Sequence, residues 1–95
     1  MKVLGVHHLE EFKRGHPEGA KRAAALVAEM KEATWRTPQD IKNHYRHASF
    51  LPANVVVFNM HGNRYRLAAR IAYQTQTVII MRIGSHGEYE SWDLA

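Results

Sequence analysis

The spacing of apolar residues changes near residue 50, from a helical period in the first half of the chain to a strand period in the second. Leu9 and Phe12 lie three residues apart, which predicts a helix over residues 6–14. A broader apolar stripe follows Pro17, a residue that suits the first turn of a helix because its missing N–H has no partner there. We therefore expect a second, longer helix over residues 17–33.

Two shorter elements complete the first half. Thr37 followed by Pro38 is typical of a helix N-cap with proline at the first position, and it predicts a third helix that ends near Tyr45. At the other end, residues 2–4 read as a short edge strand that stops at Gly5. The first half is thus expected to be helical apart from this strand.

The second half is rich in β-branched residues and alternates between apolar and polar positions. Strands are predicted over residues 55–60, 64–73 and 77–83. Turns are predicted over residues 51–54, 61–63 and 74–76, and a short helix or turn over residues 86–92. We expect one α+β domain over residues 1–95, with N-terminal helices packed on a small, mainly antiparallel C-terminal sheet.

Composition narrows the choice of partner. The chain has 95 residues, a formal charge of +4 and a pI of about 9.7, so it favours a polyanion such as nucleic acid, or an acidic protein. Many folded domains carry such a charge without a nucleic-acid role, so charge alone leaves the question open. The absence of cysteine excludes disulfides, thiol catalysis and thiolate metal sites, and it fits the cytoplasm. We expect no signal peptide and no membrane helix.

Arginines are the most informative polar residues of the predicted strands. Arg64, Arg66 and Arg70 share one parity with the small residues Ala68 and Ala72, so they predict a half-open phosphate-binding face. The alternative is a solvated strand face whose arginine stems cover apolar neighbours. Arg82 shares its parity with Ile80, so it is expected to point inward unless a bulge re-aims it.

The segment after the last strand carries candidate acid/base chemistry. His86 follows the strand directly, with Gly84 and Gly87 on either side, and Tyr89 comes three residues later. A histidine can exchange protons near neutral pH and a tyrosine can stack on a base, which suits RNA cleavage by the 2′-OH. The alternative is a turn histidine and a tyrosine that packs on the sheet edge. The histidine pairs lack the spacing of metal ligands, so we predict no metal and no cofactor.

Three blocks of sequence resemble the HigB family of bacterial toxins, within the RelE-like superfamily. They are Val57 to Leu67 (VFNMHGNRYRL), Val78 to Ile80, and Gly84 to Glu90 (GSHGEYE). The resemblance implies a ribosome-associated, metal-independent endonuclease that cuts messenger RNA. It also implies an antitoxin partner that carries a helix-turn-helix domain, as in HigA-like proteins.

Site residues follow from the same resemblance, position by position. Arg66 would bind the scissile phosphate or stabilise its transition state, His86 would act as the acid/base group, and Tyr89 would position the substrate. Arg64 would add a phosphate contact, and we also expect Arg70 from the arginine row to bind RNA.

The chain departs from the family pattern at three positions. A basic residue is common five places before the histidine, but Met81 stands there and Arg82 follows it; a one-residue offset in a strand changes the face. His61 replaces an expected hairpin glycine, and Val55 replaces a frequent basic residue. We nevertheless expect Arg82 to bind RNA.

Two other functions compete with the endonuclease. One is a catalytically weak relative that binds RNA, the ribosome or an antitoxin without cutting. The other, a DNA-binding repressor, is disfavoured because no segment reads as a helix-turn-helix with a basic recognition helix.

Overall fold

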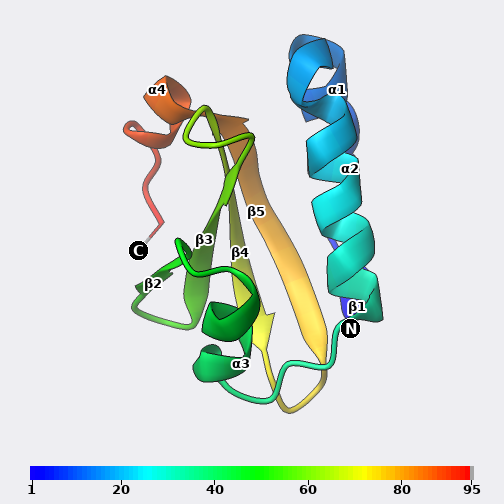
Figure 1. The fold of residues 1–95 in the computed structure, drawn as a ribbon, viewed down its shortest axis with the longest axis vertical. Helices are drawn as coiled ribbons and strands as arrows, with labels where there is room; N and C mark the ends of the chain where they lie inside the picture. The colour runs from blue at the N-terminus through cyan, green and yellow to red at the C-terminus, as the bar shows by residue number, and fades with distance from the viewer. Residues whose placement is uncertain (95) are drawn as a thin grey trace.

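A computed structural model describes residues 1–94 of the chain. Its five strands form one mixed sheet in the order β1-β5-β4-β3-β2 (Figure 1). The strands are β1 (Lys2–Leu4), β2 (Ser49–Leu51), β3 (Val55–Met60), β4 (Tyr65–Ala72) and β5 (Thr77–Ser85). Only the β1–β5 pair is parallel, and the remaining pairs are antiparallel. The prediction of an α+β fold with a mainly antiparallel sheet is confirmed.

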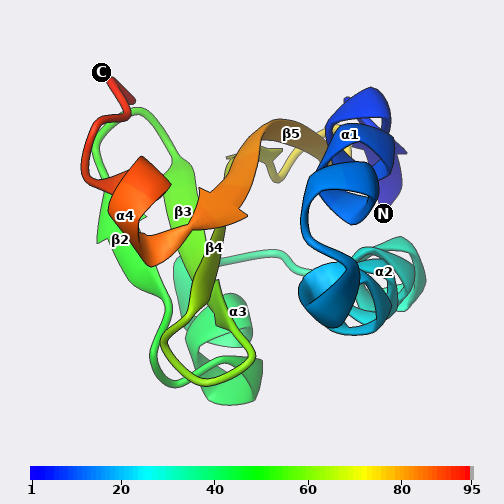
Figure 2. The ribbon, with the colours of Figure 1, turned by 90° about the horizontal axis from the view of Figure 1, so that it is seen from above.

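Helices lie on both sides of this sheet. They are α1 (His7–Gly15), α2 (Pro17–Glu32), α3 (Pro38–His44) and the short α4 (His86–Tyr89). Seen from above, α1 and α2 lie on one side of the sheet, and α4 with the segment after it lies on the opposite side (Figure 2). The predicted edge strand and all three predicted N-terminal helices are present within a residue or two of their expected bounds.

The start of α3 shows why these local predictions succeed. The Thr37 hydroxyl accepts a hydrogen bond from the Asp40 backbone N–H at 3.3 Å. The Asp40 carboxylate in turn accepts from the backbone N–H groups of Arg36 and Thr37 at 2.8 and 3.1 Å. These bonds, led by the one from Arg36, lower the pKa of Asp40, so the cap is formed by the charged carboxylate.

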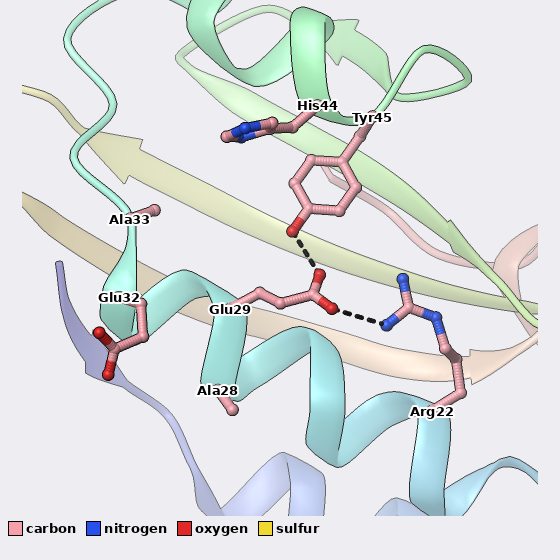
Figure 3. Close-up of a pocket in the computed structure, with 7 residues that line it drawn as sticks. All are labelled: Arg22, Ala28, Glu29, Glu32, Ala33, His44 and Tyr45. Atoms are coloured by element: carbon pink, nitrogen blue, oxygen red, sulfur yellow. Dashed lines mark hydrogen bonds and ion pairs between the residues drawn. The ribbon is translucent and has the colours of Figure 1, made fainter.

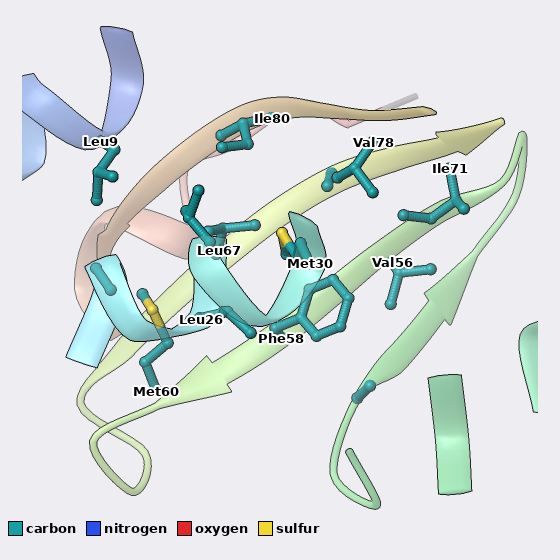
Figure 4. Packing of buried hydrophobic residues seen from close by; sticks show 14 of the residues in the cluster. Leu9, Leu26, Met30, Val56, Phe58, Met60, Leu67, Ile71, Val78 and Ile80 are labelled. Carbon is teal, nitrogen blue, oxygen red and sulfur yellow. The ribbon is translucent and has the colours of Figure 1, made fainter. Parts of the chain in front are cut away.

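The main core lies between the sheet and the N-terminal helices (Figure 4). Apolar residues of α1 and α2 pack there on the inward residues of β3, β4 and β5. The largest group in this layer is aromatic: Trp35 stacks on Phe58 with ring centroids 5.9 Å apart, and Tyr45 meets Phe58 edge-on at 5.2 Å. This layer holds the sheet against the helices and leaves its opposite face for other contacts.

One strand was not predicted. Residues 51–54 were expected to form only a turn, but Leu51 ends strand β2, whose three residues pair with Val55–Val57. The turn itself is present, with Ala53 and Asn54 both in the left-handed region at φ 61°. Three residues are too few to show an alternating pattern, and the exposure of Ser49 and Phe50 hides the strand further.

A bulge in β5 decides which face Arg82 occupies. Ala68 pairs with Arg82, whereas the next residue, Ala69, pairs with Ile80, so Met81 is an extra residue without a partner in β4. Ala69 and Ile80 belong to the main core, and Arg82 therefore leaves the sheet on the opposite face, with Ala68. Of the two orientations that the sequence left open for Arg82, the structure shows the second, because the bulge cancels its shared parity with Ile80.

Candidate functional site

The candidate site lies where α4 follows β5, and a capping box fixes this junction. The Ser85 hydroxyl accepts a hydrogen bond from the Glu88 N–H at 3.1 Å, and the Glu88 carboxylate accepts from the Ser85 N–H at 2.8 Å. The bond from Ser85 is the main cause that lowers the pKa of Glu88. In addition, the His86 N–H donates to the Arg64 carbonyl at 2.8 Å, which ties α4 to the β3–β4 hairpin.

His16 links α4 to the helices on the other side of the molecule. Its Nε2 lies 3.2 Å from a Glu88 carboxylate oxygen, and its ring stacks on Phe12 with centroids 4.7 Å apart. Its Nδ1 is buried and has no hydrogen-bond partner among the described residues. Nothing in the sequence pattern near His16 marks this role, because the contact joins residues 72 positions apart (88 − 16).

Arg66 is the most constrained cation of the site. Its side chain is buried, with 8% of the residue exposed. Its guanidinium donates to the Asn63 backbone carbonyl at 2.8 Å and to the Asn63 side-chain oxygen at 3.0 Å. The guanidinium carbon lies 5.5 Å from the centroid of the Tyr89 ring. No described carboxylate forms an ion pair with Arg66, so its charge is held in one position without being neutralised.

His86 lies at the outer end of the same group. Its ring centroid is 6.5 Å from that of Tyr89, and about half of its side chain is exposed. Its Nε2 lies 3.2 Å from a Glu90 carboxylate oxygen, one helical turn away. Arg66, Tyr89 and His86 therefore follow one another across the end of the sheet, and the structure brings all three predicted catalytic residues together.

Arg64 does not share a face with Arg66. Strand β4 begins only at Tyr65, so Arg64 belongs to the turn, and its guanidinium carbon lies 5.9 Å from the Tyr65 ring. The Tyr65 hydroxyl donates to Glu18, and this bond lowers the pKa of Glu18, with a smaller contribution from the Arg64 charge. The predicted row of three arginines on one face is wrong because strand alternation does not extend into the turn.

Arg70 and Arg82 lie apart from this group. Arg70 is four residues further along β4, roughly 13 Å at the rise of a strand, and its Nε donates to the Ala53 carbonyl at 3.3 Å. Arg82 is exposed and lines a depression of about 260 Å³ together with His8 and Glu11 of α1. The arginines therefore form separate points of positive charge around the site.

The sheet face that carries Arg66 is more closed than the sequence suggested. Val55, Val57 and Ala68 are buried on it, outside the main core. The segment that contains α4 lies over this side of the sheet (Figures 1 and 2). A Cβ built on Gly84 would lie 3.0 Å from the Trp92 ring and 3.1 Å from the Glu88 carboxylate, so this segment packs directly on β5. The space left by the small residues of this face is therefore filled by the segment that contains α4.

The chemistry available at this site consists of fixed positive charge, a histidine and an aromatic ring. Among residues 1–94, no group of three or more potential ligands could hold a metal ion. No helix in the described part of the chain is long and apolar enough to cross a membrane.

A small α+β domain with an un-neutralised arginine beside an aromatic ring and an accessible histidine is suited to binding a phosphodiester. The chain belongs to the HigB toxin family, the RelE-like toxic component of a toxin–antitoxin system, whose pattern matches residues 20–92. Its membership implies an antitoxin as a partner. No curated protein matches the chain in sequence.

Proposed function

We propose that this toxin is an endoribonuclease that cuts messenger RNA, in association with the ribosome and without a metal ion, and so stops translation in the cytoplasm. The observation that carries the proposal is the position of Arg66, whose guanidinium is buried, free of carboxylates and held by Asn63 and Tyr89. A fixed cation of this kind stabilises charge that develops on a phosphate, because it needs no reorganisation during the reaction. A HigA-like antitoxin with a helix-turn-helix domain would keep the enzyme silent.

The reaction is an attack of a ribose 2′-OH on the adjacent phosphodiester. The attacking oxygen loses its proton to a base and forms a bond to phosphorus, while the 5′-oxygen of the next nucleotide leaves and accepts a proton. This gives a 2′,3′-cyclic phosphate and a free 5′-hydroxyl. His86 exchanges these protons, and its Nε2 must turn away from Glu90 to do so. Arg66 stabilises the charge on the phosphate, and Tyr89 stacks on or orients the substrate.

The first experiment is induced expression of the wild type and of His86→Ala in bacteria, with 5′-end mapping of messenger RNA within minutes. New ends inside coding regions with the wild type only are expected. His7→Ala is the matched control, because His7 is also exposed and lies on α1, away from the site. If a folded, soluble wild-type protein produces no new ends, the chain is instead an RNA- or ribosome-binding protein that does not cut.

A second experiment separates catalysis from binding. Arg66→Ala is expected to lower the cleavage rate of bound RNA by about 100-fold or more while affinity falls much less. Arg70→Ala is the matched control, since Arg70 lies on the same strand but donates only to the Ala53 carbonyl. It should lower RNA affinity modestly and leave the rate of the bound complex unchanged. Equal losses of rate and affinity in Arg66→Ala would make Arg66 a general binding residue.

A further inference from the structure

A second depression, of about 360 Å³, opens beside the hairpin that holds Arg66. We call it the basic depression. No carboxylate lines it, and its walls are Arg22, His44, Tyr45, Arg46, His47, Ala48, Asn59, His61 and Gly62. Arg22 is paired with Glu29 at 3.3 Å, so Arg46 carries the free permanent charge. Each histidine supplies a ring N–H donor in either protonation state.

The basic depression exists because β2 is short. Strand β2 pairs with β3 only as far as Val57, so Asn59 lies on a part of the edge that β2 does not cover. The loop after α3 forms the facing wall of the depression, and Lys42 fixes this loop by donating to the Ala48 carbonyl at 3.0 Å. In the part of the chain that the structure describes, no residue forms an ion pair or hydrogen bond with the side chains of Arg46 or His47. Their donors are therefore free to bind a ligand.

A larger neighbouring cavity provides a contrast. It has a volume of about 630 Å³ and shares Arg22, His44 and Tyr45 with the basic depression, but Glu29 and Glu32 also line it (Figure 3). The Glu29 carboxylate there accepts from the Tyr45 hydroxyl at 2.6 Å and binds Arg22. Two carboxylates repel a phosphate, whereas the basic depression next to this cavity has none.

The basic depression lies one strand away from Arg66 in the sheet. Asn59 is the cross-strand partner of Arg66, so their Cα atoms are about 5 Å apart, and Asn59 also forms part of the wall of the depression. Hydrogen-bond donors thus lie on both sides of Asn59, from Arg66 on β4 and from Arg46 and His47 after α3. This proximity favours one extended ligand that occupies both places.

We propose that the basic depression binds backbone phosphates of the same RNA strand whose scissile phosphate lies at Arg66. The proposal rests on the proposed function and adds a second RNA subsite to it. Arg46 gives a charge-assisted hydrogen bond to one phosphate, and His47 and His61 donate to the same phosphate or to the next one. The RNA strand crosses the uncovered edge of β3 at Asn59, between the two subsites.

Binding of two RNA lengths tests the proposal. Labelled 2′-O-methyl RNA cannot be cut, because its 2′-oxygen carries no proton, so affinity can be measured by fluorescence anisotropy as salt is varied. A randomised trinucleotide reaches only the Arg66 site, and a randomised octanucleotide reaches both. The test variant is Arg46→Gln with His47→Gln. Its matched control is Arg14→Gln with His7→Gln, which removes the same groups from exposed positions on α1.

We expect the test variant to bind the octanucleotide about tenfold more weakly than the control, with a salt slope smaller by about 0.7 for each lost phosphate contact. Both variants should bind the trinucleotide equally. Equal octanucleotide affinity would overturn the proposal. So would a test variant that keeps its RNA affinity but escapes neutralisation by the antitoxin, since the surface would then belong to a protein partner. Failure of the proposed function is a separate outcome, in which the folded wild-type protein produces no new messenger-RNA ends whatever the octanucleotide affinities are.

Discussion

The two faces of the sheet are built differently, although the same strands form both. On the helix face, β3, β4 and β5 contribute large apolar side chains that α1, α2 and Trp35 cover. On the opposite face the buried residues are small, and the buried Arg66 lies among them. Among residues 1–94, the only helix on that side is α4, a four-residue segment held by its capping box and by His16. One face therefore stabilises the fold, while the other uses little apolar burial to position charge.

Phe58→Ala should have the largest effect on stability, because it removes the central ring of the aromatic group on the helix face. A loss of about 3–5 kcal/mol in the free energy of unfolding is expected for a fully buried phenylalanine. Urea denaturation followed by circular dichroism measures it. A loss below about 1 kcal/mol would show that the helix face collapses around the cavity and is not the more rigid of the two faces.

Val56 and Val57 offer a matched pair, since they are neighbours, both 1% exposed, and point to opposite faces. Val56→Ala should cost about 2 kcal/mol, because large side chains around it cannot fill the cavity. Val57→Ala should cost about 1 kcal/mol, since the short segment over that face can move inward. The same denaturation experiment compares them, and equal losses would mean that both faces are equally rigid.

Gly84→Ala disturbs only the segment containing α4, which packs over the sheet face that carries Arg66. The new Cβ would press on the Trp92 ring and on Glu88, which must move by a few tenths of an ångström. We expect a loss of stability of about 1 kcal/mol, together with a fall in cleavage rate of about tenfold because α4 carries His86 and Tyr89. Cleavage of a short RNA, assayed on protein shown to be folded, gives the result. Unchanged cleavage would separate the position of α4 from catalysis.

Acid should loosen the Arg66 face first, and this is the smallest expected effect. The pKa of Glu88 is lowered from its ordinary value of 4.5, so its carboxylate stabilises α4 fully above that value. The contribution is lost as the pH falls through the lower, folded-state pKa. A Trp35→Phe variant leaves Trp92 as the sole tryptophan, and its fluorescence should change in this range. In Glu88→Gln, which keeps a capping side chain without the titration, the change should disappear.

Local patterns were enough to predict most of the fold. Pro17, Thr37 and the β-branched run of β3 each set an element through interactions with near neighbours, and these predictions are confirmed. The short strand β2 and the bulge at Met81 were not predicted, because both depend on pairing with residues distant in sequence.

The candidate site also has features that could be predicted from the sequence and features that could not. The spacing of His86 and Tyr89 is visible in the sequence, and a short helix or turn was predicted there. The capping box of Ser85 and Glu88 was not predicted and is seen only in the structure. The contact of His16 with Glu88 could not be predicted, since it joins opposite ends of the chain. The roles of Arg66, His86 and Tyr89 stay predictions until cleavage is measured.

The extra residue at Met81 has a consequence for how related chains are aligned and how this one tolerates deletions. Counting forward from Ile80 assigns Arg82 to the wrong face of the sheet, whereas its cross-strand partner, Ala68, assigns it without ambiguity. A deletion of Met81 would leave Ile80 and Arg82 adjacent, on alternate faces of an uninterrupted ladder. A deletion at Val78 or Ile79 instead inverts every β5 residue on one side of the gap. The bulge is thus the one position of β5 where the length of the strand can change while its side chains keep their faces.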